Sequence, residues 1–347
     1  MKTQALRDKD RAVLAAAVEH YLKSGRPVSS GSIHQKKILP DSPATLRNIL
    51  SRLEDLGYLA QPHTSSGRVP TDRGLRFYVN SLLDGVPLTF EQISLFAQDL
   101  SIKKGDLPGL LHQASRLLAE QSDSLGFVIQ PRISKIHFHH IRFIRIAPGK
   151  VMIILMTPFN LVLTEIVVTE TTFDQEELDR ASQYINGSFA GRTLSQARDC
   201  VLAELGKSTS KFERALSRLT NLLRVSILQD EQEDPIIVQG ASKLIGKFET
   251  LDLSRLKSLF QNIEEKAVLA KLLSEFIALD RVKVLIGSES NLPAIADCAL
   301  VLSHYGDRTQ VLGSLGIIGP KRLPYGKIIP LVDNVARKLT QTISRTT

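Results

Sequence analysis

The chain has 347 residues and few of the features that secreted or membrane-spanning proteins need. Cysteine occurs only twice, at Cys200 and Cys298, so no disulfide framework is indicated and a reducing cytoplasm is expected. No stretch approaches the roughly 18 consecutive apolar residues of a membrane helix. The start, MKTQALRDKD, lacks the apolar core of a signal peptide. These absences predict a cytoplasmic protein without a membrane partner.

The sequence also lacks the motifs of common enzyme chemistry. It has no P-loop and no Gly-x-Ser-x-Gly nucleophile motif. Gly313, Gly316 and Gly319 do not have the spacing of a dinucleotide-binding loop, and Pro320 stands where the helix of such a loop should begin. A strand with close backbone approach is the better interpretation, and we expect no enzyme.

Three neighbouring histidines, His137, His139 and His140, could suggest a metal site. No carboxylate or cysteine accompanies them locally, and zinc usually needs three or four ligands. An exposed strand face explains them better. We therefore expect neither a metal nor another cofactor.

The excess of positive charge lies in the two ends of the chain and not in its middle. The whole sequence has 44 Lys or Arg and 36 Asp or Glu, a net charge of +8. Residues 1–85 hold 13 basic and 8 acidic residues, a net +5, whereas residues 86–280 hold 22 and 24, a net −2. Residues 281–347 also have a net +5, but it is scattered, as on a solvated surface. A basic head on a nearly neutral body favours nucleic-acid binding.

Residues 42–57 have the pattern of a DNA-recognition helix. Ser42 and Pro43 suit the cap and first position of a helix, and Gly57 suits its end. Helical spacing gives one apolar face, formed by Leu46, Leu50 and Leu53. The other sides carry the small and polar residues Ala44, Thr45, Arg47, Asn48, Ser51 and Arg52. An ordinary amphipathic helix with a solvated polar face is the alternative.

The flanking residues favour the DNA-binding interpretation. A helical stripe over residues 13–22 and a short helix from Ser29 come first, in the order of a helix-turn-helix. Residues 57–70 then predict two short strands joined by a polar tip, as in a wing; an exposed hairpin is the alternative. The tip has hydroxyls and a cation but no carboxylate, which suits phosphate or minor-groove contact.

These patterns assign candidate roles in binding double-stranded DNA. Asn48 and Thr45 are expected to read bases, and Arg47 and Arg52 to contact bases or phosphate, with Ser51 on the same outward side. The DNA backbone would be contacted by Ser42, Lys36, Lys37, His63, Ser65, Ser66 and Arg68.

A close resemblance to the heat-inducible transcription repressor family HrcA is carried by PVSSGSIHQKKILPDSPATLRNILSRLEDLGYLAQPHTSSGRVPTDRGLRFYV. Its specific segments are SPAT-x-RN, LE-x-LGYL, QPHTS-x-GR-x-PT and RFYV, and IGSES and LGIIGPKRLPYGK extend it toward the end of the chain. Gly31, Ile49 and Arg52 differ from the residues common in the family, as do Lys321 and Leu323. The operator sequence is therefore the property that the resemblance implies least.

The resemblance implies an α+β multidomain protein with an N-terminal winged helix-turn-helix, a GAF-like α+β domain and an inserted α/β dimerisation domain. It implies a homodimer that binds an inverted-repeat operator and represses class I heat-shock operons of the groE and dnaK type. A GroEL-type chaperonin would maintain the active repressor, and heat stress would remove that support. A metabolite-responsive winged-helix regulator with a small ligand in the GAF-like domain is the alternative.

Hydrophobic periodicity predicts the layout of the body. Runs at 141–147, 151–157 and 161–169 predict a three-strand meander, and strand-like runs return at 282–287 and 311–316 after a long helical stretch. This order predicts one α+β domain interrupted by an insertion. The expected domains are 1–88 for DNA binding, 89–190 with 275–347 for the GAF-like domain and its initial linking helices, and 191–274 for the inserted dimerisation domain.

The insertion contains a long apolar stripe on one predicted helix. The residues of the stripe are Phe212, Leu216, Leu219, Leu223 and Ile227. A stripe of this kind is more often internal core than partner surface. Because a two-fold repressor needs a symmetric interface, we nevertheless expect the dimer interface here.

Overall fold

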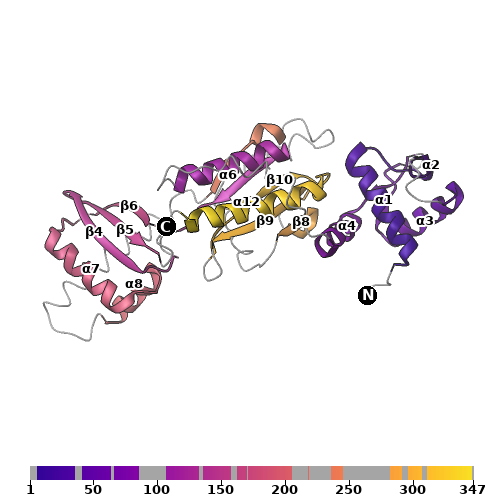
Figure 1. Cartoon of the computed structure of the whole chain (residues 1–347). Helices are drawn as coiled ribbons and strands as arrows, with labels where there is room; N and C mark the ends of the chain where they lie inside the picture. Colours follow the sequence, from indigo (N-terminus) through magenta and orange to yellow (C-terminus); the bar gives the residue numbers. More distant parts are fainter. Residues whose placement is uncertain are drawn as a thin grey trace.

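The computed structural model describes residues 6–35, 41–63, 66–85, 107–132, 136–157, 162–169, 171–204, 218, 236–244, 282–290, 296–306 and 311–345. Within these residues the chain forms an N-terminal helical unit, a central unit on a five-stranded sheet, and a third unit on a three-stranded sheet. The central unit lies between the other two (Figure 1). Helices and sheets thus combine as the predicted mixed α+β class.

The N-terminal unit has the expected order of helices and strands. It consists of α1 (Asp8–Ser24), α2 (Ser30–Gln35), α3 (Pro43–Asp55), β1 (Leu59–Ala60), β2 (Val69–Pro70) and α4 (Asp72–Gly85). Strands β1 and β2 pair as an antiparallel hairpin. The helices enclose fully buried apolar side chains, including Val13, Leu14, Val18, Ile33, Leu46, Leu50 and Leu53. The leucine spacing in the sequence therefore marks the core face of α3.

Local sequence explains where α1 and α3 begin and end. The Ser42 hydroxyl caps α3 by accepting a hydrogen bond from the Thr45 amide at 3.2 Å, and Pro43 occupies the first turn. Helix α1 ends at Gly25 with φ +70°, and Gly57 follows α3 with φ +74°. Glycine adopts this left-handed conformation without the strain that a Cβ would cause.

The central unit is built on an antiparallel sheet with the strand order β7-β3-β10-β9-β8. Its strands are β3 (Leu125–Ile129), β7 (Ile236–Gln239), β8 (Lys283–Ile286), β9 (Cys298–Gly306) and β10 (Val311–Pro320). Helices α6 (Leu107–Ser122) and α12 (Tyr325–Arg345) lie side by side over the sheet (Figure 1). Apolar side chains are buried on both faces, which explains why β9 and β10 are almost continuously apolar.

The glycines of β10 allow the backbones of neighbouring strands to approach closely. A Cβ on Gly316 would lie 2.2 Å from the carbonyl oxygen of Val301, and one on Gly313 would lie 2.4 Å from that of Ile129. Both distances are far below a van der Waals contact. This confirms the interpretation of the glycine series as part of a strand.

The third unit is a separate sheet of β4 (His140–Ala147), β5 (Lys150–Met156) and β6 (Val162–Val168), paired in that order. Helices α7 (Gln175–Phe189) and α8 (Leu194–Glu204) enclose a core of its own with this sheet. Its largest completely buried members are Phe138 and Phe143. The predicted meander is therefore present as three consecutive antiparallel strands.

The expected domain bounds remain a prediction, and two features of the described residues bear on them. Residues 89–190 with 275–347 would join the meander to the later strands, but β3, β7, β8, β9 and β10 form their sheet without it. A boundary at 190 would also separate α7 from α8, which share one core. The apolar pattern of a strand does not reveal which distant strand it pairs with.

Two expectations from composition can be examined in the described residues. None of their helices is long and apolar enough to cross a membrane. Cys200 and Cys298 are free thiols, and burial raises the pKa of the Cys298 thiol to about 12. Cys298 is therefore protonated at neutral pH and packs as a small apolar side chain.

Candidate DNA-binding surface

Helix α3 separates its side chains into a buried and an exposed face. Ile49 is only 4% exposed, and the three leucines of the apolar face are completely buried. Between residues 42 and 52 the exposed residues are Ser42, Pro43, Ala44, Arg47, Asn48 and Ser51. Residues 43–52 include no carboxylate, so the surface offers amide and guanidinium donors together with the positive end of the helix dipole.

Thr45 lies at the edge of this surface and is half-buried. Its hydroxyl oxygen is 3.0 Å from that of Ser42, so the two hydroxyls are hydrogen-bonded at the helix cap. The predicted base-reading threonine therefore also belongs to the structure that starts α3.

Arg52 lies differently from the expected DNA-facing arginine. Its guanidinium forms an ion pair with Asp10 of α1, whose side chain is 3% exposed, while that of Arg52 is 42% exposed. The pair directs the guanidinium toward α1. Asp10 was missed from the sequence, although it precedes Val13 and Leu14 by three and four residues and so places a carboxylate on the apolar stripe of α1.

The three expected departures in the N-terminal unit, Gly31, Ile49 and Arg52, have different surroundings. Ile49 is part of the core and cannot read a base directly. Arg52 is held by Asp10. Gly31 is exposed on α2, and among the described residues a Cβ built there would meet only the Ser29 hydroxyl, at 3.8 Å. Gly31 is therefore the one of the three that leaves open space on the surface.

The hairpin tip is organised by hydrogen bonds within the turn. Ser66 donates from its hydroxyl to the His63 carbonyl oxygen at 2.7 Å and accepts from the His63 amide at 3.0 Å. His63 is exposed, as a phosphate-contacting side chain must be. The other predicted backbone contacts, Lys36, Lys37 and Ser65, lie outside the described residues.

Arg68 attaches the hairpin to α3. Its Nε donates to the Glu54 carboxylate at 2.7 Å, and its backbone exchanges two hydrogen bonds with Val28, at 2.7 and 2.8 Å. A Cβ on Gly67 would lie 2.7 Å from the Val28 carbonyl oxygen, so glycine is required for this approach. The guanidinium that was predicted to contact DNA thus has a carboxylate partner in the structure.

The turn between α3 and the hairpin is also fixed from α4. The Thr71 hydroxyl donates to the Gly57 carbonyl oxygen at 2.7 Å. Arg73 donates to the Leu56 carbonyl oxygen at 2.8 Å and lies over the Tyr58 ring, 4.4 Å from its centroid. Helix, hairpin and α4 therefore form one rigid element.

Comparison with known proteins shows which family the chain belongs to. The sequence model described as HrcA protein C terminal domain matches residues 109–329. A heat-inducible transcription repressor HrcA from Xanthomonas euvesicatoria pv. vesicatoria is 36% identical over 326 residues, which cover 94% of this chain and 93% of the relative. The chain belongs to the HrcA family.

Further likenesses extend over nearly the whole chain. The HrcA repressor of Xylella fastidiosa is 36% identical over 334 residues, 96% of this chain and 95% of that one. A crystal structure titled as a hypothetical protein has a TM-score of 0.64 at 25% identity and covers 99% of this chain and 100% of its own. HrcA proteins are heat-inducible transcription repressors and not enzymes, as was expected from the missing catalytic motifs.

Proposed function

We propose that this HrcA-family chain binds an inverted-repeat operator as a homodimer and represses class I heat-shock operons of the groE and dnaK type. Its N-terminal unit would act as a winged helix-turn-helix, with α3 in the major groove and the β1–β2 hairpin as the wing. The observation that carries the proposal is the exposed face of α3, where Arg47, Asn48 and Ser51 stand together without a carboxylate.

The proposed roles follow side-chain chemistry and exposure. Asn48 can bond an adenine edge through two hydrogen bonds, and Arg47 can bond guanine or phosphate. His63 and the Ser42 hydroxyl are suited to the DNA backbone, as are Lys36, Lys37, Ser65 and Ser66 on the sequence prediction. Arg52 and Arg68 would reach DNA only by exchanging their carboxylate partners for phosphate.

The three-stranded sheet supports a dimer interface in the third unit. On the face that α7 does not cover, Ile146, Val162, Ile166 and Val168 are 47% to 61% exposed. Contiguous exposed apolar side chains of this kind mark interaction surfaces, and a second copy is the partner that two-fold DNA binding requires. The stripe predicted at residues 212–227 lies outside the described residues and stays a second proposed interface.

The dimer proposal is tested by analytical ultracentrifugation of Ile166→Asp. A charge in the middle of the apolar face should shift the chain toward monomer. Leu202→Asp is the matched control, because Leu202 is an exposed apolar residue, 46% exposed, on α8 of the same unit. Equal behaviour of the two variants contradicts an interface on the sheet.

The proposal includes maintenance by a GroEL-type chaperonin, on the basis of family resemblance. A repressor of small folding free energy would lose activity on mild heating, and a chaperonin would restore it. Operator binding by the purified chain should then fall after heating and recover with chaperonin and ATP. Full binding before and after heating without chaperonin contradicts this part.

A footprint on the chaperone promoters tests the proposed function directly. Protection of an inverted repeat supports heat-shock repression. Protection that is released only by a small metabolite favours the ligand-responsive regulator instead. A chain that protects no site more than random DNA contradicts both.

A further inference from the structure

The N-terminal and central units meet along α4. This helix lies next to β8, and α2 and α3 lie on the far side of the N-terminal unit (Figure 1). Leu75 and Val79 of α4 are buried in the same apolar cluster as Val284 and Ile286 of β8. The two units are therefore joined by a packed interface and not by a free linker alone.

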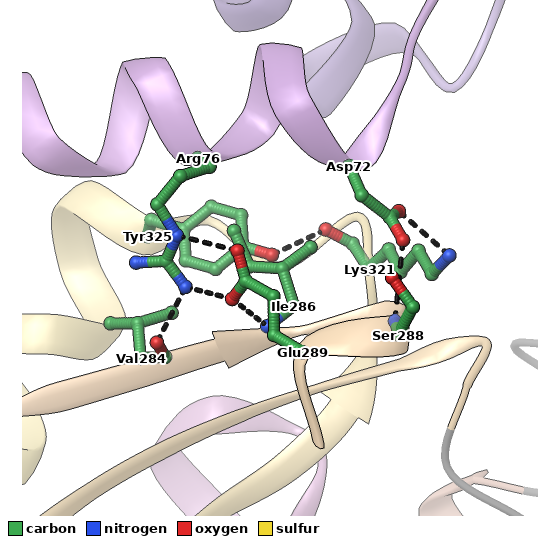
Figure 2. A network of polar contacts seen from close by, with 8 residues as sticks. All are labelled: Asp72, Arg76, Val284, Ile286, Ser288, Glu289, Lys321 and Tyr325. Atoms are coloured by element: carbon green, nitrogen blue, oxygen red, sulfur yellow. Dashed lines mark hydrogen bonds and ion pairs between the residues drawn. The ribbon is translucent and has the colours of Figure 1, made fainter. Parts of the chain in front are cut away.

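Arg76 forms the first polar anchor of this junction (Figure 2). Its Nε donates to Glu289 at 2.8 Å, its Nη2 pairs with the other carboxylate oxygen, and Nη2 also donates to the Val284 carbonyl oxygen at 2.6 Å. Glu289 in turn accepts the Ile286 amide at 2.9 Å. A bidentate Arg–carboxylate contact with added backbone hydrogen bonds fixes the direction of the guanidinium as well as its distance from the carboxylate.

Asp72 forms a second anchor one helical turn earlier. Its carboxylate pairs with Lys321 at 2.7 Å and accepts the Ser288 amide at 3.3 Å (Figure 2). The Lys321 carbonyl oxygen accepts a hydrogen bond from the hydroxyl of buried Tyr325 at 2.8 Å, which ties this segment to the start of α12. Two anchors at separate points of α4 prevent the N-terminal unit from rotating about either one.

We propose that these two anchors determine which operator spacing the dimer accepts, so that Asp72, Arg76, Glu289 and Lys321 set specificity without touching DNA. This rests on the proposed function. Each added base pair moves a half-site by about 3.4 Å and turns it by about 35°. A flexibly attached DNA-binding unit can follow that change, whereas a rigidly attached one cannot.

The test compares Glu289→Gln with the wild-type full-length chain. The glutamine keeps an oxygen for the Ile286 amide but loses the ion pair with Arg76. The probes are the inverted repeat found by footprinting, the same duplex with its centre shortened or lengthened by one and two base pairs, and a single half-site. The matched control is Glu120→Gln, which breaks the exposed Arg116–Glu120 pair of α6, a contact within one helix.

Wild type and control should bind the duplexes of altered spacing with an affinity about tenfold lower, or lower still, than their affinity for the native repeat. Glu289→Gln should lower that ratio to about threefold and leave the half-site affinity unchanged. Exchanging the charges, Arg76→Glu with Glu289→Arg, should restore part of the wild-type ratio.

Two results would overturn the role of the junction. In the first, Glu289→Gln discriminates between native and altered spacings as strongly as the wild type does. In the second, Glu289→Gln loses the same affinity on all probes including the half-site, which indicates damage to the DNA-binding unit itself. If the wild-type chain bound the inverted repeat no more tightly than random DNA, the proposed function would be wrong, and the spacing proposal would be wrong with it.

Discussion

Two arginines of α3 have the same chemistry but different surroundings. Arg47 and Arg52 stand five residues apart on the same helix. Arg47 is exposed and has no carboxylate partner among the described residues, whereas Arg52 is paired with a buried aspartate of α1. The position of an arginine on a predicted recognition helix is therefore not enough to make it a DNA contact. Its neighbours in the fold decide whether the guanidinium is available.

The difference separates stability from recognition. Residues of the inner face, together with Arg52, should change the free energy of unfolding when altered. Residues of the outer face should change DNA affinity and leave the fold intact. Substitutions at four positions of α3 test whether stability and recognition are separated in this way.

Leu50→Ala should have the largest effect on stability. Leu50 is completely buried, and its truncation leaves a cavity that costs about 2–5 kcal/mol of unfolding free energy. Urea denaturation measures the loss. Ser51→Ala, on the exposed face of the same helix turn, is the control and should stay within about 0.5 kcal/mol. Comparable losses in both variants would show that the two faces are not distinct.

The Asp10–Arg52 pair should respond unequally to loss of either partner. Arg52→Ala leaves Asp10 buried without its counter-ion, at a cost of about 2–3 kcal/mol. Asp10→Asn costs less, about 1 kcal/mol or below, because the partly exposed Arg52 can turn to water. The double variant should be more stable than Arg52→Ala alone. Equal losses in the two single variants would contradict this asymmetry.

Asn48→Ala should weaken operator binding by about 1–3 kcal/mol and relax selectivity at one base pair. Its side chain is exposed, so the melting temperature should not change. Affinities for the operator and for random DNA, measured at one salt concentration, check the prediction. An equal loss on both DNAs excludes base reading by Asn48.

Arg47→Ala should show the smallest but most diagnostic effect, in salt dependence. If Arg47 binds phosphate, its removal lowers the slope of log affinity against log salt by about 1. Arg52→Ala, compared at a temperature where both variants are folded, should leave the slope unchanged. A lower slope for Arg52→Ala would mean that Arg52 exchanges Asp10 for phosphate on binding.

Short-range features of the fold were predictable from the sequence. The Ser42 cap, the Gly57 stop and the leucine face of α3 depend on residues within a few positions of one another, and so does the hairpin-connected meander. The strand pairing of the central sheet was not predictable in this way. The pairing of β3 with β10 joins residues almost two hundred positions apart, and the apolar pattern of a strand does not identify a partner at that distance.

In the candidate site, too, local features were predictable and long-range contacts were not. The exposure of Arg47, Asn48 and Ser51 follows from the helical repeat, whose phase the leucines set. The partners of Arg52 and Arg68 come from other elements, α1 and the end of α3, so helical phase alone could not assign them. The junction of α4 with Glu289 and Lys321 was also invisible, since its partners are over two hundred residues away.

The motifs of the sequence carried the resemblance to the HrcA family. By itself, the sequence also determined the basic N-terminal unit and the helix whose small and polar face is turned outward. It could do so because charge, caps and helical periodicity act over a few residues. Only the tertiary structure decided which cations of that unit are free and how the unit is held against the body. Those properties depend on carboxylates that folding brings from distant parts of the chain.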